Sequence, residues 1–393
     1  MPRKAFLIAF DETPAEPELH AAVQQVDVEE NAALPTTFAF RVRLSRDRTG
    51  QWKGTDDDRF SLFTKVSIDA GAVGDSSQAA SLEPIAEGYV TAVGVHIGAQ
   101  PDDAYLEVRG MDATALMSVE EKTVSWPNMA DSDIVQQIVS TYGIPLQATS
   151  TTPVRQQNDT LLIQRGTDAR FLRLLARRNG FEFSFSKERG AATTCYFGPP
   201  RVSGTPQADL AIQFGEQSSL ASFDVTAHGL RPLAVATTQV DIKTKNESTA
   251  NVTASQLNAL GSSGLSSLIE SKLDSLVNPL EQQGRLLLLA QPSADAAELQ
   301  SIAQAVRDEA EWLIAARGEV NTDAYGTVLR AGRLVLIKGA GKQHSGAYYV
   351  TRVRHLIKNN GTHVQTFEAR RNARDVTGSE RFADAAAFGV PAA

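Results

Sequence analysis

The alternation of apolar and polar positions predicts short β-strands near the start of the chain. Phe38, Phe40 and Val42 alternate with Ala39, Arg41 and Arg43, the period of a half-buried strand. Further strands are expected over 19–29, 66–69, 87–93 and 105–110, with a break at 31–35. Short strands punctuated by Gly and Pro favour a barrel or sandwich over a parallel sheet.

The block from Leu329 to His355 predicts a second set of strands that closes another small barrel. Ala331-Gly332 can turn the chain into the apolar run Leu334–Ile337, and Gly339, Gly341 and Ser345-Gly346 can form the next turns. Residues 349–355 then alternate as a half-buried strand. No catalytic group stands out in this block, so we interpret it as structural.

Between these blocks the pattern changes to the helical period. Asp131, Ser132 and Asp133 offer N-cap oxygens to a helix whose apolar stripe reaches Tyr142 and which Gly143 ends. A second helix is expected from Thr167-Asp168 to Asn179-Gly180. It should bury Phe171, Leu172, Leu174 and Leu175, and a strand carrying Phe181, Phe183 and Phe185 should follow.

The later part of the chain predicts more strands and two helices. Strands are expected over 222–226 and 234–242, and the Asn/Ser/Thr/Gly-rich stretch 246–264 suggests a flexible excursion. A modest helix over 265–276 precedes a stronger one that starts at Ser293 or Asp295, with Asp295 and Glu298 as a capping box, and ends at Arg317 before Gly318. The closing strands occupy 319–371, and the Ala-rich tail 384–393 is expected to fray.

These elements predict a β-rich α+β fold. We expect two small tube-type β-barrel domains with an inserted α+β domain and additional helices. The expected boundaries are a first barrel over 1–115, an inserted α+β domain over 116–210, a second barrel over 211–375 with a helical insertion at about 246–318, and a C-terminal tail over 376–393.

Composition narrows the function classes. A net charge of −8 argues against nucleic-acid binding as the main role, because phosphate binding needs a concentrated basic face. The single cysteine, Cys195, excludes an internal disulfide and a Cys-based zinc site, and we interpret it as a core residue. We expect no signal peptide and no membrane insertion, since no apolar run approaches about 20 residues.

Candidate chemistry in the chain is sparse. His344, His355 and His363 fall on neighbouring predicted strands and could form a zinc site, but no HExxH pair occurs and no carboxylate that would orient the histidines is evident. The run 56–58 reads as a solvated loop, and the arginines of the second helix as a solvated face. These arginines are Arg170, Arg173, Arg177 and Arg178. No phosphate loop or nucleophile elbow is present, so we expect no catalytic residues, no metal and no cofactor.

Three segments carry a family resemblance. They are 131–138 with Tyr142-Gly143, 164–176 with Asn179-Gly180-Phe181, and 331–355. Their order and spacing resemble the late-control protein D family of contractile phage tails, whose hub fold is shared with VgrG spikes and contractile injection systems. The resemblance covers about residues 1–375.

The resemblance implies a non-enzymatic baseplate hub. Three subunits with two similar barrels each would present six units to a sixfold tail tube and a threefold face to a spike. The chain has no room for the spike's own barrel and β-needle, which implies a separate trimeric spike protein beside other baseplate components. Synthesis in the bacterial cytoplasm is expected, with assembly into either a phage tail or an injection particle.

We expect the Asp131–Tyr142 helix and the Leu299–Ile314 helix to pack between domains or subunits. The candidate residues on these two helices and on the helix that starts at Thr167 are Ile134, Ile138, Tyr142, Phe171, Leu172, Leu299, Ile302, Val306 and Leu313. The alternative function is a tail-associated protein that degrades cell walls or binds carbohydrate. Such a protein would share the strand content but would not explain the helical segment between two barrels.

Overall fold

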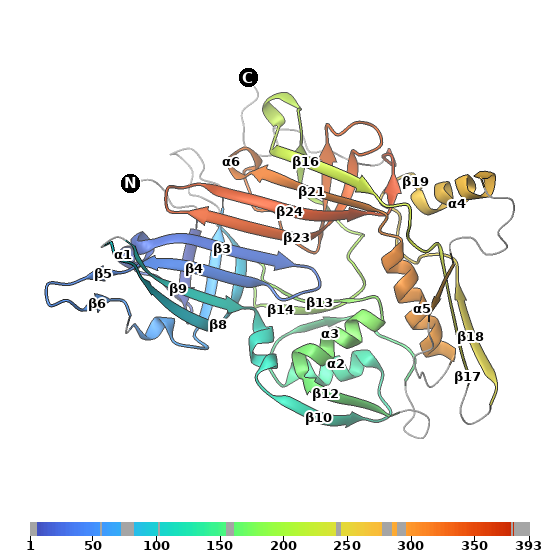
Figure 1. Cartoon of the computed structure of the whole chain (residues 1–393), viewed down its shortest axis with the longest axis horizontal. Coiled ribbons are helices and arrows are strands. Elements are labelled where there is room, and N and C mark those ends of the chain that lie inside the picture. Colours follow the sequence, from blue (N-terminus) through green and yellow to red (C-terminus); the bar gives the residue numbers. More distant parts are fainter. Residues whose placement is uncertain are drawn as a thin grey trace.

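The computed structural model describes residues 6–55, 57–71, 82–100, 103–154, 161–240, 245–276, 285–288, 296–378 and 380. Most strands belong to one 13-stranded sheet that surrounds two separate cores (Figure 1). The fold is β-rich α+β, as the sequence predicts. It combines two strand assemblies, an inserted α+β unit and additional helices.

The first strand assembly encloses a core of aromatic and β-branched side chains that includes Val26, Phe40 and Val108. Its elements are β1 (Phe6–Phe10), β2 (Thr13–Pro14), α1 (Pro17–Ala22), β3 (Val23–Asn31), β4 (Thr37–Arg43), β5 (Ser45–Arg46), β6 (Trp52–Lys53), η1 (Asp58–Phe60), β7 (Lys65–Ala70), β8 (Glu83–Ile97), β9 (Ala104–Met111) and η2 (Ala113–Ser118). The strand predicted from residue 19 begins only at Val23. Residues before it form a helix that starts with Pro17, whose fixed φ suits a first helical turn.

The inserted unit packs two helices against small sheets. Its elements are β10 (Glu121–Trp126), α2 (Asp131–Ser140), β11 (Leu146–Ala148), β12 (Leu162–Thr167), α3 (Asp168–Arg178), β13 (Glu182–Ser186) and β14 (Thr194–Gly198). Both predicted helices are confirmed, and the Thr167 hydroxyl accepts from the Arg170 amide as an N-cap. The N-cap predicted for α2 is wrong: Ala130 occupies that position, and the Asp131 carboxylate binds Arg178 instead.

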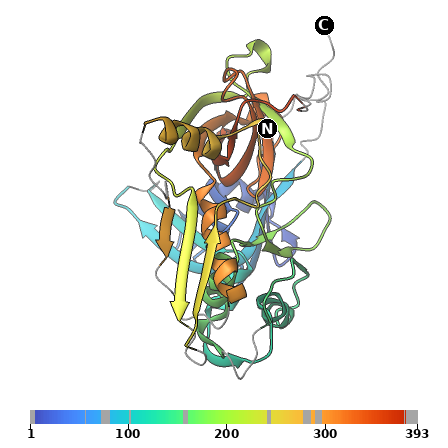
Figure 2. The ribbon, with the colours of Figure 1, turned by 90° about the vertical axis from the view of Figure 1, so that its right-hand side faces the viewer.

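The third region completes the large sheet and adds helices outside it. Its elements are β15 (Gln207–Ala211), η3 (Gly215–Gln217), β16 (Leu220–Ala227), β17 (Ala234–Val240), β18 (Glu247–Val252), β19 (Ser263–Gly264), α4 (Leu265–Leu276), β20 (Arg285–Leu288), α5 (Ala296–Ala310), β21 (Ile314–Asn321), α6 (Thr322–Tyr325), β22 (Arg333–Lys338), β23 (Gly346–Lys358), β24 (His363–Arg371) and β25 (Ala373–Arg374). Seen from the side, the β17–β18 hairpin stands in front of α5 (Figure 2).

Two expectations for this region are wrong. The stretch 246–264, expected to be a flexible excursion, contains β18, which pairs with β17. The buried Leu260 anchors its later part, because its amide donates to Asn372 and its carbonyl accepts from the fully buried Arg371. The long helix ends at Ala310 rather than Arg317, because residues from Ile314 onward pair as β21 with two strands.

The two strand assemblies are joined in one sheet. β23 pairs with β24 on one edge, and with β22 and then β3 on the other. The order β16-β21-β24-β23-β3-β4-β9-β8 is antiparallel at every step, so the first four strands and the last four form one uninterrupted surface (Figure 1). The second core lies beneath the first four strands.

The closing block follows the predicted turns with one irregularity. Gly332 and Gly339 have φ of 74° and 87°, as the predicted turns require. The alternation expected over 349–355 is interrupted, because the register shifts between Val350 and Arg352. This bulge lets Tyr348, Tyr349 and Val350 all be buried in succession. The capping residue Asp295 and the tail 384–393 lie outside the described residues.

Candidate assembly surfaces

The candidate packing residues of α2 and α3 meet inside the inserted unit. Ile134, Ile138, Phe171 and Leu172 are buried in one core, and the Tyr142 hydroxyl donates to Asp168 at 2.7 Å. Leu174, expected to be buried, is 55% exposed. These contacts are internal to the chain, and a role between subunits stays a prediction.

The candidate residues on the helix predicted to end before Gly318 divide between two cores. Leu299 packs with Val235 and Val252 of the β17–β18 hairpin, with Val306 partly buried beside them. Ile302 is half-buried. Leu313 lies beyond the end of α5 and is 1% exposed in the core of the second strand assembly. Leu313 therefore does not belong to the helical face on which the sequence pattern placed it.

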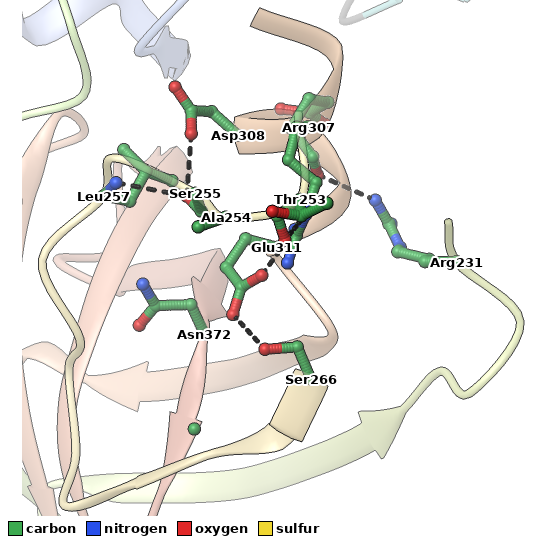
Figure 3. Close-up of polar contacts among 12 residues, drawn as sticks. Arg231, Thr253, Ala254, Ser255, Leu257, Ser266, Arg307, Asp308, Glu311 and Asn372 are labelled. Atoms are coloured by element: carbon green, nitrogen blue, oxygen red, sulfur yellow. Dashed lines mark hydrogen bonds and ion pairs between the residues drawn. The ribbon is translucent and has the colours of Figure 1, made fainter. Parts of the chain in front are cut away.

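The last turns of α5 hold neighbouring segments through polar contacts (Figure 3). Nη1 of Arg307 lies 2.5 Å from Oε2 of Glu311, and both side chains are buried. The Ser266 hydroxyl donates to Glu311 at 2.9 Å, while Asp308 accepts from the Ser255 hydroxyl at 2.8 Å. This end of α5 thus fixes the chain between β18 and α4, and the i, i+4 spacing of Arg307 and Glu311 was a signal that our sequence analysis missed.

The other end of α5 contacts the inserted unit. Arg178 binds Asp131 of α2 and lies 3.6 Å from Glu298 of α5. Gly180 sits against Ala305, so that an added Cβ would lie 3.1 Å from the Ala305 Cα. Arg178 is therefore not part of a solvated face as expected. It joins three helices from two regions of the chain.

A buried polar chain lies where the two strand assemblies meet. Nδ1 of His355 is 3.3 Å from Nε2 of His363, and Nε2 of His355 is 3.5 Å from Oε1 of Glu30. Arg330 donates to Glu30 at 2.9 Å. Burial alone would raise the pKa of Glu30, but the charge of Arg330 and the neighbouring His355 outweigh it and lower that pKa.

The three histidines of the candidate zinc site do not come together in the structure. Two of the three proposed histidines come together, but His344 lies in the turn before β23, where its carbonyl accepts from Tyr348. Within the described residues, no group of three or more His, Cys, Asp or Glu side chains could hold a metal ion. Burial and the neighbouring His355 lower the pKa of His363 to about 3, so this imidazole is neutral at ordinary pH.

A further contact joins the inserted unit to the second assembly. The Tyr349 hydroxyl donates to Oε2 of Glu182 at 2.5 Å, and the Tyr349 ring stacks on Trp312 with centroids 5.8 Å apart. Burial raises the pKa of Glu182 to about 7, although the hydrogen bond from Tyr349 and the charge of Arg201 oppose the shift. These rings form one wall of an open groove of about 670 Å³ between α3, α5 and β23.

The solvent face of the eight-strand surface carries charges that alternate from strand to strand. Successive cross-strand partners are Asp224, Arg317, Glu368 and Arg352. The ionic contacts across this face are Asp224–Arg317 at 3.1 Å, Glu368–Arg352 at 3.1 Å, Arg352–Glu29 at 3.7 Å, Arg354–Asp27 at 2.6 Å and Arg41–Glu107 at 2.9 Å. Exposed pairs of this kind stabilise a fold by only about 0–1 kcal/mol each. We therefore interpret the alternating charges as a property that this face needs for its role at the surface, and not for the stability of the fold.

The remaining sequence predictions concern Cys195, the acidic run 56–58 and membrane-spanning segments. Cys195 is buried, and burial raises the pKa of its thiol, which makes it unreactive. Asp57 binds Arg59 and caps η1, so this part of the acidic run is paired within the loop. None of the described helices combines the length and apolarity needed to cross a lipid bilayer.

The geometry can be compared with known proteins. The profile of a family described as the Alg8 N-terminal domain matches residues 23–359. A comparison with curated protein sequences gives no match.

Several solved structures share the fold. The 43 kDa tail protein of prophage MuSo2 from Shewanella oneidensis superposes with a TM-score of 0.62 and 13% identity, over 95% of this chain and 100% of that chain. The tail protein from Neisseria meningitidis MC58 gives 0.60 and 11%, over 94% and 96%. The E. coli c3393 protein, described as a type VI secretion component structurally similar to T4 bacteriophage tail proteins gp27 and gp5, gives 0.53 and 12%, over 93% and 76%.

Proposed function

The chain belongs to the family described as the Alg8 N-terminal domain, and we propose from its fold that it is a baseplate hub of the late-control protein D and VgrG-like type. The hub would serve a contractile phage tail or a contractile injection system. It would be a homotrimer that adapts a sixfold tail tube to a threefold spike. The shared fold with two phage tail proteins and a type VI secretion component supports this proposal.

One observation carries the proposal most strongly: the uninterrupted antiparallel surface that runs through both strand assemblies. Four strands, from β16 to β23, cover one core, and four strands, from β3 to β8, cover the other. A chain with two such assemblies gives a trimer six comparable units, which is what a contact with a sixfold tube requires. We propose domain boundaries near 115, 210 and 375 on this basis.

We place the alternating-charge face on the inside of the ring. Its acidic and basic groups already bind one another across the strands, so the face has little net charge to retain a passing molecule. It is also mainly polar, so it offers few apolar side chains to adhere to cargo. The α5 helix and the inserted unit would then form the outer part of each subunit, where they could meet other baseplate components.

The proposed partners follow from this arrangement. One annular face would receive the tail tube protein, and the opposite face would hold a separate trimeric spike. The protein would be made in the bacterial cytoplasm and assembled into the particle without a cofactor. Its role would be mechanical and not catalytic.

Electron microscopy of the purified protein tests this proposal. Class averages should show a ring with threefold symmetry and a central channel. Adding the candidate spike should cover one opening of the channel and leave the other free. Compact particles without a channel, both alone and with the spike, would overturn the proposal.

A further inference from the structure

An open groove lies between α3, α5 and β23, where the inserted unit meets the second strand assembly (Figure 1). Gly180 and Ala305 both line it, and their close approach brings the end of α3 against α5. The groove has a volume of about 670 Å³. Ligand-binding clefts of proteins have volumes of roughly 300–1,000 Å³, so this groove can receive several side chains of a partner.

Aromatic and aliphatic side chains line part of the groove. Phe181 lies beside the stacked rings of Trp312 and Tyr349 in this lining. Leu34, in the loop between β3 and β4, adds an aliphatic side chain that is 56% exposed. Its amide donates to the Asn31 side chain at 3.0 Å, which fixes the loop at this point. An exposed leucine next to aromatic rings suits contact with an apolar side chain of a partner.

Two arginines of α3 line the same groove. Arg173 and Arg177 are one helical turn apart, so their side chains lie next to each other on one face of the helix. Arg177 is exposed and Arg173 is half-buried, and among the described residues neither guanidinium has a hydrogen-bond or ion-pair partner. The charge of Arg173 acts on the buried Asp112, but two backbone amides already occupy that carboxylate. Two neighbouring cations are therefore available to an anionic group.

The carboxyl groups that line the groove are already bound within the chain. Their partners are Arg370 for Glu309, Arg352 for Glu368, the Ser255 hydroxyl for Asp308 (Figure 3) and the Tyr349 hydroxyl for Glu182. The raised pKa of Glu182 also keeps this acid largely neutral below about pH 7. The charge left without a partner in the groove is thus positive, although the whole chain carries a net charge of −8.

These features favour an acidic peptide over a nucleic acid as the ligand. Glu309 and Glu368 would repel a continuous chain of phosphates, whereas a peptide can place single carboxylates where the arginines are. Guanidinium groups bind carboxylates through paired hydrogen bonds, and a peptide also carries apolar side chains for the aromatic lining.

We propose that this groove binds an acidic segment of a partner protein, with its carboxylates at Arg173 and Arg177 and an apolar side chain beside Leu34. The inference deepens the proposed assembly role and rests on it for the kind of partner, since it names the chemistry by which a further component attaches to the hub. It does not depend on how the subunits join one another.

Fluorescence anisotropy with a short labelled peptide of Glu and Leu provides the direct test. The full-length protein should bind this peptide, more weakly as salt is added, and should not bind the same peptide with Gln in place of Glu. Arg173→Gln/Arg177→Gln should weaken the binding by about tenfold or more, because two charge-assisted contacts are lost. Arg170→Gln, at an exposed position on the same helix outside the groove, is the matched control and should bind as the wild type does.

Light scattering on the same samples separates this inference from the hub proposal. The double variant should keep the mass of the wild type, and a lower mass would show that the groove receives a second copy, which would overturn the inference. A trimeric wild type that does not bind the Glu peptide, or that binds labelled single-stranded DNA more tightly, would overturn the inference while the hub proposal stands. A monomeric wild type that binds the peptide through the two arginines would support the groove and count against the hub.

Discussion

Tyr349 of β23 donates a hydrogen bond of 2.5 Å to Glu182 of β13, and this contact joins the second strand assembly to the inserted unit. The carboxyl is buried, so its charged form is costly, and its pKa is raised to about 7. Below about pH 7, the contact is best described as a bond between a tyrosine and a largely neutral acid. The junction is thus sensitive to pH.

We expect Glu182 to reduce stability as the pH rises. Its folded-state pKa of about 7 exceeds the ordinary value of 4.5, so between these values the unfolded chain loses a proton that the folded chain keeps. The free energy of unfolding should fall through this window, by up to about 1.4 kcal/mol per pH unit, and level off above it. Urea unfolding at a series of pH values measures this dependence. The free energy of unfolding of Glu182→Gln should not fall in this window, whereas that of Glu216→Gln, at an exposed carboxylate, should fall as in the wild type.

His363 should act in the opposite direction. Its pKa of about 3 in the folded chain lies below the ordinary value of 6.5, so between these values only the unfolded chain binds the proton. The free energy of unfolding should therefore decrease as the pH falls from about 6.5 towards 3. The free energy of unfolding of His363→Asn should depend less on pH in this range than that of the wild type. The control His228→Asn, at an exposed position, should show the same pH dependence as the wild type. An unchanged acid slope in His363→Asn would refute this assignment.

Removing one partner of the Arg307–Glu311 pair should destabilise the fold far more than replacing both partners with apolar residues. Glu311→Leu or Arg307→Met alone leaves a buried group without its partner and should reduce the free energy of unfolding by about 3–5 kcal/mol. The double variant Arg307→Met/Glu311→Leu should recover most of that loss. Asp224→Ala, in an exposed pair with Arg317, is the control and should cost less than about 1 kcal/mol. Additive losses in the double variant would argue against the pairing.

Gly318 should not tolerate a side chain. It lies in the middle of β21, where an added Cβ would come within 2.7 Å of both the Ser222 carbonyl oxygen and the Phe367 ring. Gly318→Ala should therefore lower the melting temperature, with a loss of about 1–3 kcal/mol. Gly94→Ala places the same methyl group in open space and should have a small effect. Equal melting temperatures for the two variants would contradict this packing.

The sequence predicted a helix well where the residues that begin and end it lie next to it in the chain. α3 has a capping threonine and an apolar stripe, and both are found in place. α5 was predicted too long because Leu313 and Ile314 keep the helical spacing, although Ile314 already begins a strand. What ends α5 is pairing of β21 with β16 and β24, which depends on residues about 90 positions before and 50 after it in the chain, and which no local pattern reveals.

The candidate surfaces were less accessible to sequence reasoning for the same reason. Val93, Val95 and Ile97 show the strand alternation, so a longer β8 could have been predicted, but the part of β8 that pairs with β7 depends on where β7 begins and ends. The approach of His355 to His363 depends on the register of β23 and β24. Periodicity shows which residues face a core, whereas partners across a sheet are set by long-range pairing.

The absolute mass of the purified protein by light scattering tests the central claim most directly. A homotrimeric hub predicts about 127 kDa, three times the 42.2 kDa chain, at micromolar concentration. A wild-type mass of 42.2 kDa that stays unchanged up to high concentration and in the presence of the candidate spike would contradict the account.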